Sequence, residues 1–586
     1  MRTLLLILFI GFISLYSNFD LHAQISLRYE NNETLTYDEV IEAYKYLDEK
    51  YKTAKLLTVG ETDIGKPLHL FVMSKDSDYD PESIHKKGRC VIFVNNGIHP
   101  GEPPGIDASI QFAIDVLDNK AKMNKYLDNC VICIIPVYNI GGCLNRSPYH
   151  RTNQDTPPES GFRGNGKNLD LNRDFIKMDS KNARSLVQTF HTWKPEVFLD
   201  THTTNGSDHQ YTLTLIATVF QRLPEPMSSY FKENMVPSLY NKMKTSPYEM
   251  IPYVNWNTRN ADDGISAYFD APRVSTGFAS LFNTYAFMTE NHVYKPFSDQ
   301  VKSVYHFLSA LAEFSNANYK EIIKTKKQAD KISANEKLFI SSWRLNKNLK
   351  EMLLFKGYNG EMKKSPLTGN MNYHYDINSP YIKEVPFYQY FTPGDTIQKP
   401  KMYIIPQAWE KAIEYLMLNG VRLSRLQKDM KIEVEAYYLE SFKYSQRPGN
   451  GHFRINEIKT NRENQTIQFY KGDYIIEMDQ PTNRFIMEVL EPTTIDSYIS
   501  WNFFNPIFDR REYFSPSGFE KKAMNYLESN LDLKQKFEEK KANDPDFAEN
   551  GYSQMGFIYT NSPYYEKSHK RYPVYRINNT INLPFE

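Results

Sequence analysis

From about residue 50 to residue 310, short apolar runs alternate with helix-like patterns, and this alternation restricts the fold more than any other feature of the chain. Three of the runs are CVIFVNN (90–96), CVICIIPVYN (130–139) and PEVFLDTH (195–202). Helix-like stretches follow them, for example PGIDASIQFAIDVLD (104–118), whose first residue is a proline, as a first helical turn tolerates. Strands that alternate with helices predict an α/β domain with a mainly parallel sheet.

The character of the chain changes near the polar segment TKKQADKISANEK (325–337). We predict a catalytic domain over residues 24–325 and an accessory, β-rich region with some helix over residues 338–586. In this second region QAWEKAIEYLMLNG (407–420) and residues 518–544 look helical. KIEVEAYYLESF (431–442), TIQFYKGDYIIEM (466–478) and NRFIMEVL (483–490) look strand-like.

The first 23 residues have the pattern of a secretory signal peptide. Arg2 precedes thirteen mostly apolar residues (4–16), and LHA (21–23) is a plausible cleavage site. The apolar stretch is short for a spanning helix, which needs about 20 residues. We therefore expect an exported protein, periplasmic or secreted, with no membrane span after cleavage.

Charge and cysteine content exclude some classes of protein. Lys plus Arg and Asp plus Glu balance at 70 each, so no basic field for nucleic acid is expected. Cys130 and Cys133 stand three apart in a strand-like run and would face opposite sides of it, so we interpret them as core residues and not as ligands of one metal. One disulfide among the four cysteines remains open, and the sequence gives no indication of an oligomeric state.

Side chains typical of metal and anion sites stand where the predicted strands end. His99 and Glu102 follow one strand, and His202 and Glu290 close two others. In open α/β sheets, ligands bind beyond the carboxyl ends of the strands. Two histidines and one carboxylate are a known ligand set for a catalytic zinc, with a fourth position left for water. We therefore predict one zinc per chain, held by His99, Glu102 and His202, and the rivals for the third ligand are His191, His209 and His292.

The segments HPGE (99–102), DLNRDF (170–175) and THTTNG (201–206), with Glu290 at a later strand end, resemble the zinc carboxypeptidases of the carboxypeptidase A type, as an exported bacterial member. The resemblance covers roughly residues 35–310. It implies a twisted, mixed sheet of eight strands with helices on both faces and one zinc at its rim.

On this resemblance Asp170 orients a zinc-bound histidine, and Asn172 and Arg173 hold the terminal carboxylate of the substrate. Alternation along an extended segment would turn Asp170 and Asn172 toward the site and Leu169 and Leu171 toward the core.

The resemblance also implies roles for residues outside these motifs. Glu290 corresponds to the general base. Arg151 is the best match to the arginine that stabilises the oxyanion, with Arg146 and Arg163 as alternatives in the same long loop. Tyr268 matches the tyrosine that caps the substrate, and Arg273 could be a second anion-binding group.

Three hypotheses on function are left open. The first is a zinc metallocarboxypeptidase that acts on peptides or peptidoglycan stems with a free carboxylate. The second is a zinc-dependent deacylase of N-acyl amino acids, similar to aspartoacylase, which shares a His-x-x-Glu motif and an LNR segment. The third is a binding protein without activity. Every matched position holds a chemically competent residue, which weighs against the third.

Overall fold

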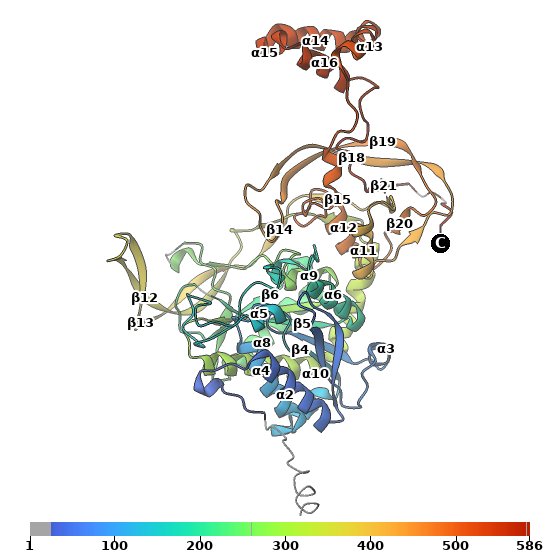
Figure 1. Ribbon diagram of the computed structural model, residues 1–586. Coiled ribbons are helices and arrows are strands. Elements are labelled where there is room, and N and C mark those ends of the chain that lie inside the picture. The colour runs from blue at the N-terminus through green and yellow to red at the C-terminus, as the bar shows by residue number, and fades with distance from the viewer. Residues whose placement is uncertain (1–24, 205, 259–260, 580, 582, 586) are drawn as a thin grey trace, which may run out of the picture. The chain divides into compact units, whose positions relative to one another are not determined.

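A computed structural model of the chain describes residues 25–204, 206–258, 261–579, 581 and 583–585. The predicted signal peptide lies outside these residues. The chain divides into two compact units (Figure 1): the first extends to Ser333 and includes Trp343–Pro393, and the second comprises Ala334–Ser342 and the chain from Gly394 onward. Among the helices of the described residues, none combines the length and the apolar character that crossing a membrane requires.

Eight strands of the first unit form one mixed sheet, which confirms the predicted fold class. Their order is β1-β2-β4-β3-β5-β9-β6-β7. The central pairs β4·β3, β3·β5 and β5·β9 are parallel, and β9·β6 is antiparallel. The strands are β1 (Ala54–Glu61), β2 (Pro67–Met73), β3 (Cys90–Asn95), β4 (Cys130–Ile135), β5 (Val197–Thr204), β6 (Leu213–Ala217), β7 (Met250–Pro252) and β9 (Tyr285–His292).

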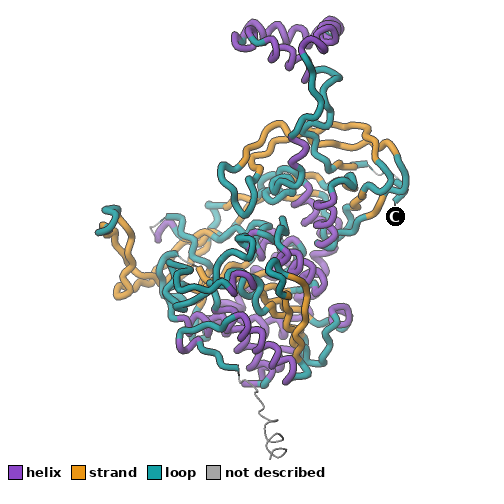
Figure 2. Tube along the Cα trace, in the orientation of Figure 1, coloured by secondary structure: helices purple, strands orange, loops and turns teal. Residues whose placement is uncertain are grey.

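Helices cover both faces of this sheet (Figure 2). One face packs in a common core with α2 (Tyr37–Lys50), α4 (Pro104–Leu117), α7 (Met227–Tyr230), α8 (Val236–Lys244) and α10 (Phe297–Asn335). The other packs against α6 (Lys181–Trp193) and α9 (Ser275–Leu281), where the ring of Phe190 lies 6.0 Å from that of Phe198 and 5.5 Å from that of Phe278. Two short helices also belong to this unit, α3 (Pro81–Lys86) and α5 (Ile140–Leu144), and Ile140 and Cys143 of α5 lie in the core of the first face.

Burial explains why the central strands are apolar throughout. Every residue of β3 and of β4 is buried, as expected for parallel strands covered on both faces. All four cysteines are buried and free, so no disulfide forms, and Cys130 and Cys133 are core residues as predicted.

Residues 343–393 form an arm of the first unit that projects from it (Figure 1). Its two long strands, β12 (Glu351–Lys364) and β13 (Met371–Tyr388), pair antiparallel, and β13 joins the short strand β8 (Ile265–Ser266). At the base of the arm, β11 (Trp343–Leu345) pairs with β14 (Phe391–Pro393). We refer to residues 343–393 as the arm.

The second unit contains a six-stranded sheet of order β17-β20-β16-β21-β18-β19, which confirms the predicted β-rich region with some helix. The strands of this sheet are β16 (Met402–Ile405), β17 (Ser424–Arg425), β18 (Met430–Tyr444), β19 (Ile455–Phe469), β20 (Tyr474–Glu477) and β21 (Tyr575–Ile577). Two further strands of the unit, β10 (Leu338–Ile340) and β15 (Thr396–Gln398), pair with each other. Its helices are α11 (Glu410–Leu418), α12 (Asn483–Leu490), α13 (Pro516–Ser529), α14 (Leu531–Asn543), α15 (Pro545–Glu549) and α16 (Gly551–Thr560).

The segment NRFIMEVL was predicted to be strand-like, and this prediction is wrong. It forms helix α12, and all eight of its side chains are buried. Its polar residues Asn483, Arg484 and Glu488 recur at helical spacing, but the run is only eight residues long, and its β-branched and aromatic residues suggested a strand.

Candidate active site

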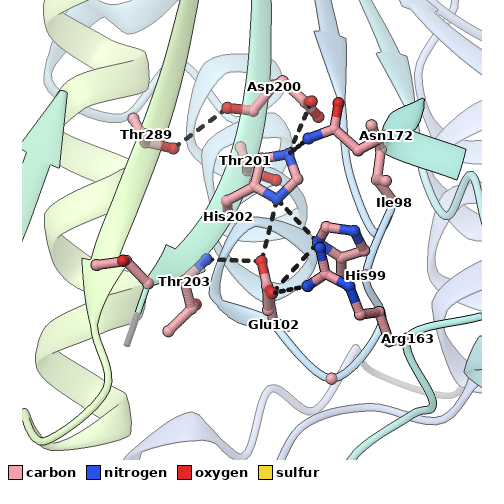
Figure 3. Close-up of polar contacts among 12 residues, drawn as sticks. Ile98, His99, Glu102, Arg163, Asn172, Asp200, Thr201, His202, Thr203 and Thr289 are labelled. Atoms are coloured by element: carbon pink, nitrogen blue, oxygen red, sulfur yellow. Dashed lines mark hydrogen bonds and ion pairs between the residues drawn. The ribbon is translucent and has the colours of Figure 1, made fainter. Parts of the chain in front are cut away.

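Three side chains predicted as metal ligands meet at the carboxyl ends of β3 and β5 (Figure 3). The Nδ1 atoms of His99 and His202 are 3.2 Å apart. Glu102 places Oε1 at 3.2 Å from His99 Nδ1 and Oε2 at 3.0 Å from His202 Nδ1. All three side chains are buried, and they form the one group of three or more His, Cys, Asp or Glu residues with metal-binding spacing among the described residues.

The spacing of these three donors fits a zinc ion. Tetrahedral ligands about 2.1 Å from zinc lie about 3.4 Å from one another, which is close to the separations of 3.0 to 3.2 Å seen here. Two imidazole nitrogens and one carboxylate are also donors that zinc prefers. The residues present therefore fit the metal that the sequence predicts.

Two glycines explain how the loop 96–103 reaches this point. A Cβ on Gly105 would lie 2.0 Å from Thr201 Oγ1, so only glycine lets the first turn of α4 pack this closely against β5. A Cβ on Gly101 would lie 2.8 Å from the side chain of Arg151. The glycines near His99 and Glu102 thus allow the backbone at Gly105 to approach β5 closely and the backbone at Gly101 to approach Arg151 closely.

Each histidine is held from behind by a carboxylate. His99 Nε2 lies 2.9 Å from Asp170 Oδ1, the contact that the family resemblance implies. His202 Nε2 lies 2.8 Å from Asp200 Oδ2. Such contacts fix the ring orientation and direct Nδ1 of both imidazoles toward the centre. Burial lowers the pKa of His202, but Asp200 and Glu102 together outweigh this effect and raise that pKa well above its usual value.

Asp200 is a site residue that our sequence reasoning missed. It is completely buried and accepts hydrogen bonds from Ser275 Oγ at 2.5 Å and Asn95 Nδ2 at 3.2 Å. The signal was available, because residues two apart on a strand face the same side and Asp200 precedes His202 by two.

The segment around Asn172 differs from its predicted conformation. It was expected to be extended, but Leu171–Arg173 form a 3₁₀ turn, and Asp170 Oδ1 accepts the Asn172 backbone N–H at 2.9 Å. This side-chain bond competes with an extended backbone, as aspartate often does at the start of a helical turn.

The amide side chain of Asn172 lies inside the site. It is 4% exposed, its Oδ1 accepts the backbone N–H of Ser275 at 3.1 Å, and its Nδ2 lies 3.4 Å from His202 Nε2. Arg173 is half-buried and donates from Nη1 to the carbonyl of Asn172 at 2.6 Å.

Two guanidinium groups approach Glu102. Arg151 Nη2 lies 2.9 Å from Glu102 Oε1, and Arg163 Nη1 lies 3.5 Å from the same oxygen. Arg163 also contacts Asp170 Oδ2 at 2.9 Å. It therefore bridges the predicted ligand Glu102 and the carboxylate that holds His99. Burial raises the pKa of Glu102, but the charges of His99 and Arg151 outweigh it, and the net pKa is well below the usual value. Arg151 has a φ of 58°, a conformation that costs a residue other than glycine on the order of 1 kcal/mol.

Glu290 projects from the neighbouring strand toward the same centre. It lies in register with His202 across the parallel pair β5·β9, so both side chains face one side of the sheet. Burial raises its pKa to about 8, with Glu102 and Asp200 adding to the rise and His202 and Arg151 opposing it. A cation held by the three predicted ligands would favour the charged carboxylate, as nearby positive charges do.

Tyr253 lies near Glu290 and packs against Tyr268. The rings of Tyr268 and Tyr253 are 6.1 Å apart, and Tyr253 was not singled out in the sequence. The Tyr253 hydroxyl accepts a hydrogen bond from Thr204 Oγ1 at 3.1 Å, and its pKa is raised by burial and next by the charge of Glu290. Arg273 is half-buried and precedes helix α9 by two residues.

The rival histidines lie elsewhere. His209 and His292 pack against each other with ring centroids 4.4 Å apart, and His292 Nε2 lies 3.2 Å from Asp208 Oδ1. His191 packs on Phe282 at 4.5 Å. The described group with metal-binding spacing includes none of these three.

Comparison with known proteins is consistent with this site. Residues 40–213 match the model of the family described as zinc carboxypeptidase. Carboxypeptidase 2 of Trichophyton equinum is 18% identical over 452 residues, which cover 74% of this chain and 77% of the relative. Carboxypeptidase 2 of Trichophyton rubrum is 18% identical over 429 residues, which cover 70% and 73%.

Solved structures similar to this chain include a metallo-carboxypeptidase from Burkholderia cenocepacia, at 14% identity and a TM-score of 0.37, with 48% of this chain and 70% of that chain covered. Carboxypeptidase A from Helicoverpa armigera is similar at 14% identity and a TM-score of 0.37, with 49% and 75% covered. The segment of residues 40–213, which contains His99, Glu102 and His202, is therefore similar to the zinc carboxypeptidase family, and the curated relatives are carboxypeptidases by name.

Proposed function

We propose that this protein is an exported carboxypeptidase that hydrolyses the peptide bond next to a free C-terminal carboxylate, with one zinc held by His99, Glu102 and His202. The observation that carries the proposal is the meeting of two Nδ1 atoms and one carboxylate from distant parts of the chain within 4.8 Å of one another. Bound zinc would polarise the scissile carbonyl and lower the pKa of water from 15.7 to about 7.

Glu290 is the proposed general base. Its side chain lies on the same face of the sheet as that of His202. Glu290 is not one of the three predicted ligands. Glu290 takes a proton from the attacking water and later delivers it to the leaving amine. Positioned acid–base groups of this kind contribute about 10²–10⁴-fold to rate.

Arg151 is the proposed donor to the oxyanion of the tetrahedral intermediate. Its guanidinium lies beside Glu102, which places positive charge next to the centre, and its side chain is held against Gly101. A donor fixed in this way stabilises developing charge without reorganisation. Arg163 is engaged with Asp170 through two hydrogen bonds, which supports a structural role for it instead.

Arg173 is the proposed anchor for the terminal carboxylate, because a planar guanidinium binds a carboxylate through two parallel hydrogen bonds. Tyr268 is proposed to cap the substrate, and Arg273 is proposed to be a second anion-binding group in the same pocket. For Asn172 the contacts with Ser275 and His202 support a second role, in holding the site together, next to the predicted role in substrate binding.

Substrates of the proposed enzyme are peptides or peptidoglycan stem peptides with a free carboxylate. Export is proposed from the signal-like residues 1–23. Secretion can be tested by expressing the full chain in a bacterial host and sequencing the N-terminus of the protein recovered outside the cytoplasm.

One comparison tests the reaction directly. Zinc-loaded protein is incubated with a peptide and with the same peptide amidated at its C-terminus, and products are identified by mass spectrometry. We expect release of the last residue from the free acid alone, and an Arg173→Met variant should lose this preference. Equal cleavage of acid and amide would replace the carboxypeptidase proposal with an endopeptidase or amidase.

A further inference from the structure

A pocket of about 420 Å³ with mostly aromatic walls lies at the arm, and none of its lining residues is a predicted site residue. Its aromatic residues are Trp256, which precedes β8, Phe355 of β12, and the arm tyrosines Tyr358, Tyr373, Tyr375 and Tyr381. Phe355 is buried, whereas Trp256 and these tyrosines are half-buried, so part of each side chain is accessible to a ligand. The volume lies within the range of about 300–1,000 Å³ that small-molecule sites occupy.

A break in the pairing of the two long strands brings these tyrosines together. Residues 376–379 of β13 stand opposite Asn359 of β12 alone, between two regular stretches of antiparallel pairing. An insertion of this kind bends a pair of strands and redirects its side chains, and such bulges recur beside functional sites. Tyrosines from both sides of the bend therefore line one volume.

Two glycines of β12 let tyrosine rings lie directly against the strand. A Cβ on Gly357 would lie 2.6 Å from Cζ of Tyr381, and a Cβ on Gly360 would lie 2.5 Å from Cε1 of Tyr373. The indole of Trp256 is held as well, since its Nε1 donates to Ser207 Oγ at 2.9 Å. Rings that are fixed before binding lose little conformational freedom when a ligand packs on them.

Among the described residues, the charged ones that line the pocket are Asp208 and Lys383, and both have partners. Asp208 Oδ1 lies 3.2 Å from His292 Nε2 and 3.2 Å from Lys295 Nζ. Lys383 Nζ lies 2.5 Å from Asp262 Oδ1. A charged ligand would lose hydration here without gaining a counter-ion from these two residues, so the pocket favours a neutral ligand.

We propose that this pocket binds a neutral saccharide unit. A pyranose ring has an apolar face of C–H groups, which packs on an aromatic ring, and a rim of hydroxyls, which need hydrogen-bond partners. Tyrosines supply both surfaces, because the phenol ring is apolar and its hydroxyl donates and accepts. The side-chain amide of Asn359 adds a polar group at the bend. Wall glycans and the glycans of proteins both contain such units.

The pocket is connected to strand β9, which carries the predicted base. Asp208 pairs with His292, two residues after Glu290 on β9. The next residue, His209, forms a β-bridge with Gly357 of the arm. A glycan held in the pocket would therefore anchor its carrier beside these strands. The inference goes beyond peptide hydrolysis and does not depend on it.

Isothermal titration calorimetry with the zinc-loaded full chain tests the proposal. The probes are tetrasaccharides of β-1,4-linked N-acetylglucosamine, β-1,4-linked glucose, α-1,4-linked glucose and α-1,6-linked mannose, and a proline-rich peptide, since aromatic grooves also bind such peptides. We expect at least one tetrasaccharide to bind with a Kd below about 1 mM. Preference for the N-acetylglucosamine tetramer would indicate a wall glycan, and preference for the mannose tetramer a glycoprotein. Binding of the peptide alone, or of no probe, would overturn the proposal.

Variants connect binding to the pocket. Tyr358→Ala and Tyr373→Ala remove rings on opposite sides of the bend, and each should weaken saccharide binding about tenfold. Tyr513→Ala is the matched control, because Tyr513 is an exposed tyrosine of the second unit and should leave binding unchanged. Thermal unfolding checks that each variant is folded.

Wild-type affinity in both pocket variants would overturn the proposal. Saccharide binding that these variants weaken, in a protein that cleaves no peptide, would support the pocket and contradict the carboxypeptidase proposal.

Discussion

Asp200 Oδ2 lies 2.8 Å from His202 Nε2, and Asp170 Oδ1 lies 2.9 Å from His99 Nε2. The two histidines are thus held in the same way, by carboxylates that come from different segments. Asp170 precedes a 3₁₀ turn, whereas Asp200 stands on β5, two residues before the histidine that it holds.

This symmetry predicts that Asp200 contributes to metal affinity as Asp170 does. Asp200→Asn keeps the shape of the side chain and an acceptor oxygen but removes the charge that orients His202. We expect the zinc affinity of the metal-free protein to fall about 10–100-fold, as when the partners of metal-bound histidines are lost. Competition with a chelating dye measures it.

Asp170→Asn should give a loss of similar size. Asp330→Asn is the control, because Asp330 lies on α10, accepts a hydrogen bond from Asn283 and is not among the residues of the site, so the variant should leave zinc affinity unchanged. Wild-type affinity in Asp200→Asn would show that the contact with His202 is incidental.

Glu290→Gln should separate metal binding from catalysis. Since Glu290 is not one of the three predicted ligands, the variant should hold about one zinc per chain, as measured by elemental analysis. Turnover of a free-acid peptide should fall by about 10²–10⁴-fold, because no carboxylate takes the proton from water. A variant that keeps full turnover would contradict the assignment of the base.

Gly105→Ala should damage the site through the backbone. The new Cβ would lie 2.0 Å from Thr201 Oγ1, so α4 must move away from β5 and carry Glu102 with it. We expect the free energy of unfolding to fall by about 2 kcal/mol, and zinc affinity to fall as well. Chemical denaturation and dye competition measure the two effects. Gly206→Ala, whose Cβ would meet nothing within 4 Å, should change neither.

Asp107 predicts a pH dependence of stability. Its side chain is completely buried and accepts a hydrogen bond from Thr34 Oγ1 at 2.6 Å, and burial raises its pKa to about 7. The unfolded chain has the ordinary value of about 3.9. Between these values the folded state binds more protons than the unfolded state, so the stability from this group is full below about pH 4 and is lost as pH rises through about 7.

Asp107→Asn removes this titration. Denaturant unfolding at several pH values should therefore show the variant gaining stability relative to the wild type as pH rises from about 5 to about 8. A difference between the two proteins that stays constant over this range would mean that Asp107 does not titrate there.

The apolar runs and the residues at their ends were sufficient to predict the α/β sheet and the group of His99, Glu102 and His202. Buried parallel strands and strand-end ligands leave local signals, because burial demands continuous apolar residues and catalysis places polar groups just beyond them. Asp200 was missed although it stands two residues before His202, on the same side of the strand, because its position alone does not show that it contacts the imidazole. The turn at Leu171–Arg173 was missed because it depends on a side-chain hydrogen bond from Asp170. The helix at Asn483–Leu490 was missed because its short run is rich in β-branched and aromatic residues, which outweighed its helical spacing in our prediction.

The sequence by itself therefore determined the fold class and the chemistry of the predicted metal ligands, since periodicity and residue type carry that information along a short stretch of chain. Only the tertiary structure decided that His202 lies with His99 and Glu102 while His209 and His292 pair with each other. It also brought the arm beside β6 and β7 to complete a pocket. Contacts of this kind join residues far apart in the chain, such as Gln210 and Tyr381, which are 171 positions apart, and their geometry depends on packing that no local pattern encodes.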